Sequence, residues 1–235
     1  MRSGCSLVIL AGGLSRRMGH DKATLPAGDG TLVDHLARRL GAVVDEIIIA
    51  GGSVDASTEG ARVVADHQPG LGPLAGMLAG FAAANARYVW VVGCDLPDVE
   101  PALGGLLIAL AGDYEAVVPR PDVEPEGVCA LYVRELVPRI AALLTSGERS
   151  VKSLLDRSTV RYVASDELRT VDPDLRSFRN INTPADYEDW LRTQPVSRWT
   201  HPAGVRAPLG QWWAPGRRNP RRDTRPPFHQ SGCGR

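Results

Sequence analysis

Apolar runs and amphipathic stretches alternate from residue 7 to residue 191, in the order typical of strands followed by helices. Short apolar runs bounded by turn residues predict buried strands at 7–10, 46–50, 62–66, 88–93, 116–119, 128–132 and 159–164. Apolar residues at helical spacing or Ala/Leu-rich segments predict helices at 31–40, 74–84, 101–110, 138–144, 150–156 and 184–191. The pattern therefore predicts an α/β fold with a mostly parallel central sheet and helices on both faces.

Local signals mark where two of these helices begin. Thr31 precedes a helix whose leucines recur every four residues, and Thr183 stands directly before Pro184. Threonine is a favoured N-cap residue, and proline is tolerated at the first helical position because its missing N–H costs little there. In open α/β sheets ligands bind at the carboxyl ends of the strands. We therefore look for a site in the segments 11–22, 66–76 and 94–97, which follow expected strands.

Composition fits one soluble α/β domain over residues 1–194. The chain has 235 residues, of which 43% are hydrophobic and 23% charged, enough to bury a core. No apolar stretch approaches the roughly 18 residues that a membrane helix requires. The four cysteines, at positions 5, 94, 129 and 233, show no metal-ligand spacing. We expect reduced thiols, a cytoplasmic location and no membrane partner.

Charge is distributed unevenly along a chain that is neutral as a whole. Residues 195–235 hold eight arginines and one acidic residue, together with three of the five tryptophans. A segment rich in proline and arginine with few aliphatic residues cannot form a core of its own. We expect 195–235 to be a disordered C-terminal tail and not a nucleic-acid-binding element.

A glycine-rich loop follows the first expected strand and predicts a nucleoside triphosphate site. Gly12 and Gly13 would let backbone N–H groups approach a phosphate, and Arg16, Arg17 and Lys22 supply positive charge. The loop fits neither the Walker A pattern nor the dinucleotide fingerprint, because the spacing of its glycines differs from both. A strand followed by a solvated basic loop is the plainer alternative.

Further polar residues follow later strands, and each also has a purely local interpretation. Asp95 follows the run 88–93, where a carboxylate could hold Mg²⁺ beside a triphosphate or cap a turn. Asp66 could accept hydrogen bonds from a base or a ribose. Gly72 and Gly76 could bring a helix N-terminus close to a nucleotide, or form a loop-to-helix junction. The asparagine pair at 180 and 182 offers donors and acceptors to a polar ligand, or forms a turn.

Four motifs in order resemble those of the MobA-like nucleotidyltransferases, the molybdenum cofactor guanylyltransferases. The first is L-A-G-G-x-x-x-R-M-G-x-D-K over residues 10–22; the others are G-P-L-A-G at 72–76, C-D-x-P at 94–97 and N-I-N-T-P at 180–184. The resemblance covers roughly residues 5–191. One departure is Ala50, which stands where family members can present an asparagine to the nucleotide.

The resemblance implies a Rossmann-like three-layer fold and a transfer of GMP from GTP to the terminal phosphate of molybdopterin, with release of pyrophosphate. It implies Mg²⁺ at Asp95, a leaving pyrophosphate stabilised by Arg16 or Arg17, a nucleoside fixed by Asp66, and an acceptor facing Asn180 and Asn182. The implied phosphate- and nucleotide-binding residues are Leu10, Ala11, Gly12, Gly13, Lys22, Gly72 and Gly76. The partners it implies are GTP and molybdopterin, with molybdoenzymes or cofactor-insertion proteins as further ones, for a monomer or weak oligomer.

Three other functions remain open from the sequence. A cytidylyltransferase relative that uses CTP tends to have L-A-A-G in the loop, whereas Gly12 and Gly13 are adjacent here. Sugar-1-phosphate nucleotidyltransferases usually place proline before the loop lysine, where Asp21 stands in this chain. A non-catalytic nucleotide-binding protein would bind GTP without turnover.

Overall fold

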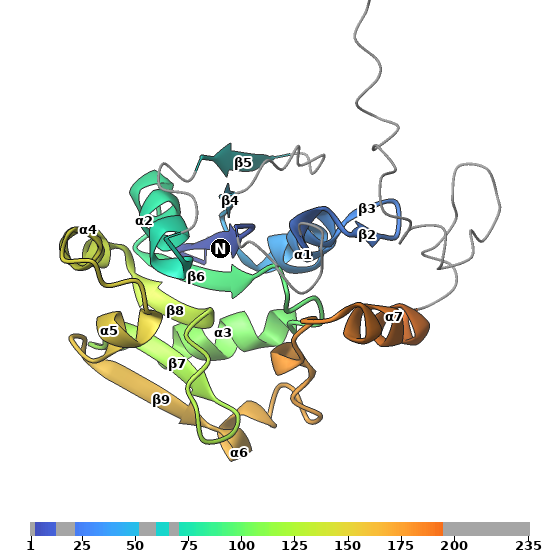
Figure 1. The fold of residues 1–235 in the computed structure, drawn as a ribbon. Helices are drawn as coiled ribbons and strands as arrows, with labels where there is room; N and C mark the ends of the chain where they lie inside the picture. The colour runs from blue at the N-terminus through green and yellow to red at the C-terminus, as the bar shows by residue number, and fades with distance from the viewer. Residues whose placement is uncertain (1–2, 13–21, 52–59, 66–70, 195–235) are drawn as a thin grey trace, which may run out of the picture.

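A seven-stranded sheet forms the centre of the protein, with strands in the order β5-β4-β1-β6-β8-β7-β9 (Figure 1). The computed structural model describes residues 3–12, 22–51, 60–65 and 71–194. The strands are β1 (Cys5–Leu10), β4 (Glu46–Ala50), β5 (Ala61–Val64), β6 (Tyr88–Gly93), β7 (Ala116–Arg120), β8 (Cys129–Val133) and β9 (Val160–Ala164). The α-helices are α1 (Leu32–Leu40), α2 (Pro73–Ala83), α3 (Pro101–Ala109), α4 (Val137–Thr145), α5 (Val151–Leu155), α6 (Ser165–Leu168) and α7 (Pro184–Thr193).

The sheet is mostly parallel, as predicted, with β8 running against its neighbours. Strand β1 pairs in parallel with β4 and β6, β4 with β5, and β7 with β9. Strand β8 is antiparallel to both β6 and β7. The start of β8 therefore lies at the edge where β6 and β7 end, and Gly93 N donates to Val128 O over 2.8 Å there.

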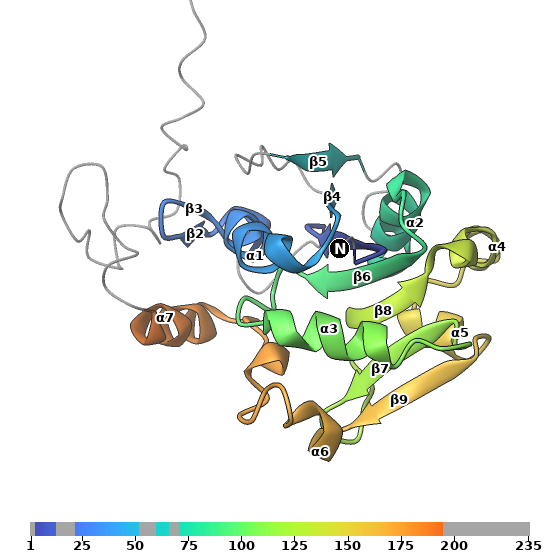
Figure 2. The same ribbon diagram turned by 180° about the vertical axis from the view of Figure 1, so that it is seen from behind.

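Alternating side chains of the central strands pack on two helical layers. Leu7 and Ile9 of β1 join a buried cluster with residues of α1 and α3, whereas Val8 and Leu10 join a cluster with residues of α2, α4 and α5. Figures 1 and 2 show these helices on opposite faces of the sheet. Because strand side chains point alternately to the two faces, one run of apolar residues fills both halves of the core. The three-layer α/β fold is confirmed.

The predicted elements agree with the structure within a few residues. The strands at 46–50 and 88–93 have the predicted bounds. Helix α1 begins at Leu32, one residue later than predicted, because Thr31 is its N-cap. The strand predicted at 62–66 is shorter, since β5 ends at Val64. Its last predicted residue, Asp66, lies outside the described residues.

A short hairpin and helix α7 form a third cluster beside the main core. The hairpin consists of β2 (Pro26–Ala27) and β3 (Gly30–Thr31), which the sequence analysis missed because two-residue strands show no periodicity. Tyr187 and Trp190 of α7 pack with residues of this hairpin and of α1. Trp190 Nε1 is also 2.9 Å from Asp98 Oδ1. This packing fixes α7 beside the loop that follows β6.

Within the described residues, no helix is both long enough and apolar enough to span a membrane. The segment 195–235 lies outside the described part of the chain, so a domain boundary at residue 194 stays a prediction.

Candidate active site

Three polar side chains from distant parts of the chain meet at the carboxyl edge of the sheet. Lys22 Nζ lies 3.3 Å from Asp95 Oδ2 and 2.9 Å from Asn182 Oδ1. The side chains of Lys22 and Asp95 are 15% and 28% exposed, respectively. Partial burial reduces solvent screening, so the ammonium and the carboxylate interact more strongly than an exposed pair.

Backbone hydrogen bonds hold the loop of Asp95 between β1 and the segment that carries Asn182. Cys94 N donates to Leu10 O over 3.1 Å, and Ile181 N donates to Asp95 O over 2.8 Å. Asp95 is thus tied on one side to the end of β1 and on the other to the approach to α7. Its position depends on the fold and not on local sequence alone.

The capping box of α7 fixes the backbone of Asn182. Asp186 Oδ2 accepts from the backbone N–H groups of Asn182 and Thr183, over 2.9 and 2.8 Å. Asp186 N lies 3.2 Å from Thr183 Oγ1, which completes the box. The hydrogen bond from Asn182 N is the largest cause that lowers the pKa of Asp186. Asn180 is exposed and makes no side-chain hydrogen bond within the described part of the chain, so it does not join Lys22.

The end of β1 and the start of α2 lie next to each other. Both are on the side of β6 where β1 and β4 lie, and Asp95 follows β6. Gly12 is exposed, whereas Ala11 N donates to Ala50 O over 2.9 Å. A phosphate contact from the amide of Ala11 would replace that bond. A Cβ at Gly76 would lie 3.1 Å from Leu10 Cδ2, so glycine allows α2 to approach β1 closely.

Gly72 precedes α2 with a φ of 80°, a conformation that favours glycine. A Cβ there would lie 3.3 Å from the carbonyl oxygen of Arg149, in the connection between α4 and α5. The structure therefore places Arg149 beside a predicted nucleotide-binding segment. The sequence analysis missed this residue because it lies in none of the four motifs.

Glu126, just before β8, is a second residue that the sequence analysis missed. Burial raises the pKa of its carboxyl, the backbone N–H of Val128 opposes that shift, and the charge of Asp95 adds to it. The hydrogen bond from Gly93 N to Val128 O, over 2.8 Å, places the segment that carries Glu126 beside the segment that carries Asp95. The only sequence signal was an acidic connection between two strands, which is a common surface feature.

The donor chemistry at Asp95 fits Mg²⁺. The described residues contain no group of three or more His, Cys, Asp or Glu side chains that could hold a metal by themselves. Mg²⁺ commonly binds through one or two carboxylates together with substrate phosphate oxygens, so it needs no such group. A Cβ at Gly93 would lie 2.6 Å from Asp95 Oδ1, which shows that glycine leaves the space in which this carboxylate folds back.

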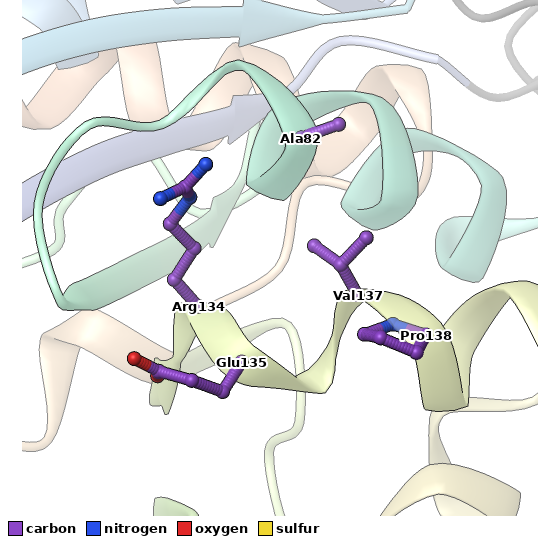
Figure 3. Close-up of a pocket in the computed structure, with 5 residues that line it drawn as sticks. All are labelled: Ala82, Arg134, Glu135, Val137 and Pro138. Atoms are coloured by element: carbon purple, nitrogen blue, oxygen red, sulfur yellow. The ribbon is translucent and has the colours of Figure 1, made fainter.

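The cavity in Figure 3 belongs to another part of the molecule. It lies between the last turn of α2 and the start of α4, and it is lined by Ala82, Arg134, Glu135, Val137 and Pro138. Arg134 N donates to the carbonyl of Arg87, directly before β6, whereas Asp95 follows β6. The cavity is therefore at the opposite edge of the sheet from Asp95. It is also open to solvent, and we do not assign it to the active site.

Four of the residues predicted for the site fall outside the described residues. They are Gly13, Arg16 and Arg17 of the loop after β1, and Asp66 after β5. The described site consists of Lys22, Asp95 and Asn182, with the end of β1 and the start of α2 beside them.

Comparison with known proteins agrees with this architecture. A family model described as the MobA-like NTP transferase domain matches residues 7–162. A molybdenum cofactor guanylyltransferase from Syntrophotalea carbinolica is 34% identical over 203 residues, which cover 81% of this chain and 92% of the relative. A protein of the same name from Desulfosudis oleivorans is 33% identical over 184 residues, covering 77% of this chain and 91% of the relative.

Solved structures show the same fold. Molybdopterin-guanine dinucleotide biosynthesis protein A from Archaeoglobus fulgidus matches with a TM-score of 0.68 and 24% identity, covering 78% of this chain and 95% of that protein. A 2-C-methyl-D-erythritol 4-phosphate cytidylyltransferase from Thermus thermophilus matches with a TM-score of 0.58 and 19% identity, covering 79% and 98%. From the family model and the sequence relatives together, this chain belongs to the MobA-like NTP transferase family.

Proposed function

We propose that this protein transfers GMP from GTP to the terminal phosphate of molybdopterin, releasing pyrophosphate and forming the guanine dinucleotide of the molybdenum cofactor. The observation that carries the proposal is the meeting of Lys22, Asp95 and Asn182 at the carboxyl edge of the sheet. The sequence relatives named molybdenum cofactor guanylyltransferase support the choice of substrates.

The reaction needs positioning and charge neutralisation more than it needs covalent chemistry. An oxygen of the acceptor phosphate attacks the α-phosphorus of GTP, and the bond from that phosphorus to the bridging oxygen of pyrophosphate breaks. Lys22 offers three N–H donors and a positive charge to the phosphates, which lowers the cost of bringing two anions together. Asp95 would hold Mg²⁺, which neutralises phosphate charge when it is bound.

The nucleotide fits the half of the site built from β1, β4 and the start of α2. There Gly12 is exposed, and the small residues of α2 allow its N-terminus to lie beside β1. Helix N-termini and glycine-rich turns present N–H groups to phosphates. We assign Leu10, Ala11, Gly12, Gly13, Gly72 and Gly76 to this half, with Arg16 or Arg17 at the leaving pyrophosphate and Asp66 at the nucleoside.

We assign the acceptor, molybdopterin, to the part of the site where Asn182 lies. Its amide oxygen contacts Lys22, so it stands directly beside the group that we assign to the phosphates. Asn180 is exposed two residues earlier and is free to contact a ligand there. The thiols of Cys5 and Cys129 are buried and form no disulfide among the described residues, which suits the reducing cytoplasm in which we place the reaction.

Pyrophosphate release with GTP, CTP or UTP, each with and without molybdopterin, tests the proposal. We expect release only with GTP and molybdopterin together, and Asp95→Asn should abolish nearly all of it. Faster release with CTP would make the protein a cytidylyltransferase. Release with a sugar 1-phosphate as acceptor would assign it to the sugar-activating relatives, and tight GTP binding without turnover would make it a binding protein.

A further inference from the structure

The connection between β7 and β8 brings a carboxylate, Glu126, to the edge of the sheet where Asp95 stands. Because β8 runs antiparallel to β6, the residues before β8 lie beside the end of β6. Gly93 N donates to Val128 O over 2.8 Å, and Glu126 N donates to Pro119 O over the same distance. These two bonds fix the backbone of Glu126 between the ends of β6 and β7.

Glu126 has no cationic partner among the described residues. Its backbone is held on both sides, since Glu126 N donates to Pro119 O and Cys129 N donates to Glu126 O, and burial together with the charge of Asp95 raises the pKa of its carboxyl. The side chain is partly buried. A carboxylate that is partly desolvated and faces like charge is costly unless a ligand donates hydrogen bonds to it. Its position at the ligand-binding edge makes a substrate the natural donor.

The sheet order places Glu126 on the opposite side of Asp95 from the nucleotide half. The glycine loop follows β1, and α2 packs against β1 and β4, all on one side of β6. Strands β8 and β7 lie on the other side of β6. A ligand that reaches Asp95 from the side of β7 and β8 therefore faces a nucleotide bound on the side of β1 and β4. This is the arrangement that an acceptor needs, because its phosphate must reach the α-phosphorus of the nucleotide.

We propose that Glu126 recognises the acceptor by accepting hydrogen bonds from the N–H groups of its pterin ring. This inference rests on the proposed function and names the residue that selects the acceptor. The 2-amino group and the adjacent ring N–H of a 2-amino-4-oxopteridine form a pair of parallel donors. The two oxygens of a carboxylate match such a pair, and its negative charge strengthens both bonds. The acceptor phosphate then lies toward Lys22, and the ring lies toward Glu126.

Steady-state kinetics of Glu126→Gln, with Glu124→Gln as the matched control, test this role. Glutamine keeps the size of Glu126 but lacks the charge and one acceptor oxygen. We expect the KM for molybdopterin to rise about tenfold or more, as for loss of a charge-assisted hydrogen bond, with the KM for GTP unchanged. Glu124 is exposed on the same connection, so its variant should match the wild type.

Binding of 6-hydroxymethylpterin, followed by its fluorescence, gives a second readout that needs no turnover. Glu126→Gln should weaken this binding by about tenfold, and Glu124→Gln should leave it unchanged. If the wild type releases no pyrophosphate but the pterin binding is weakened as expected, the proposed function fails and the role of Glu126 stands. If the wild type is active, and Glu126→Gln leaves both the KM for molybdopterin and the binding of the pterin unchanged, the proposed role of Glu126 is overturned. Absence of pterin binding to the wild type, or an equal rise of both KM values, would also overturn it.

Discussion

At the scale of single residues, the candidate site depends on Lys22 and its two oxygen partners. The motifs identified Lys22, Asp95 and Asn182 separately, but they could not show that one ammonium contacts the other two side chains. Lys22 and Asn182 are 160 residues apart, and they meet because the hairpin and α7 pack together. Glu126 and Arg149 had no motif to mark them, since their proximity to the site arises from strand direction and loop packing.

Replacing Lys22 tests the importance of the charge at this position. Lys22→Met keeps the length of the side chain but removes the ammonium that contacts Asp95 and Asn182. We expect kcat/KM for GTP to fall about a hundredfold, typical of losing one preorganised electrostatic contact. Lys152→Met is the matched control, because Lys152 forms an exposed ion pair with Asp156 on α5. If both variants kept wild-type rates, Lys22 would have no part in phosphate binding.

At the scale of elements, burial determined how much the sequence could predict. Strands β4 and β6 are rich in buried apolar residues, and their bounds were predicted to the residue. The direction of β8 was not predictable, because an apolar run looks the same in a parallel and an antiparallel strand. That direction is what brings Glu126 to the site. The hairpin at 26–31 was missed for want of any periodicity, although it supports α7.

The N-cap of α7 is expected to contribute to stability. Thr183→Ala removes the hydroxyl that accepts from Asp186 N and leaves one helix-terminal N–H without that partner. We expect a loss of about 1 kcal/mol in the free energy of unfolding, seen as a Tm lower by about 2–4 °C. Thr145→Ala is the control: its hydroxyl donates to a carbonyl near the exposed end of α4, and its Tm should stay close to that of the wild type.

Glu115 links three elements through an ion pair that predicts a pH dependence of stability. Its carboxylate is 2.9 Å from Arg139 of α4 and accepts from Thr159 N before β9. The Arg139 side chain is the largest cause that lowers the pKa of Glu115. The folded pKa lies below the unfolded value of about 4.3, so the stabilisation is full above that pH and is lost as the pH falls through the folded pKa.

Thermal unfolding between pH 7 and pH 3 measures this contribution. The Glu115→Gln variant should unfold at a lower temperature than the wild type at pH 7, and the difference should shrink below about pH 4.3. A difference in Tm that stayed constant across this range would show that the carboxylate charge is not responsible.

At the scale of the whole molecule, we propose that the two substrates bind on either side of β6. We assign the nucleotide to the side of β1, β4 and α2, and the acceptor to the side of β8, β7 and the approach to α7, since β4 and β7 lie on opposite sides of β6. Lys22 and Asp95 stand between the halves. The alternation of strands and helices predicted the three-layer fold, whereas the nucleotide side indicated by the glycine loop stays a prediction. The asparagine pair at 180 and 182 indicated the acceptor side, and only the placement of Glu126 beside the end of β6 required the three-dimensional structure.

Truncation after Gln194 tests whether the described domain is sufficient. All the contacts that we assign to Lys22, Asp95, Asn182 and Glu126 lie within residues 3–194. We therefore expect the truncated protein to keep its pyrophosphate release rate and its KM for GTP. A large loss of activity in a protein that remains folded by circular dichroism would show that residues 195–235 contribute to the site.

The most direct test of the account follows the α-phosphate of GTP. GTP carrying radioactive phosphorus at the α-position is incubated with molybdopterin and Mg²⁺, and the labelled products are separated. We predict that the wild type moves the label into a guanine dinucleotide of molybdopterin, and that Asp95→Asn, with wild-type Tm, does so at a rate lower by about a hundredfold or more. The account would be contradicted if, with the wild type, the label stayed in GTP or appeared only as free GMP. It would also be contradicted if Asp95→Asn transferred the label as fast as the wild type.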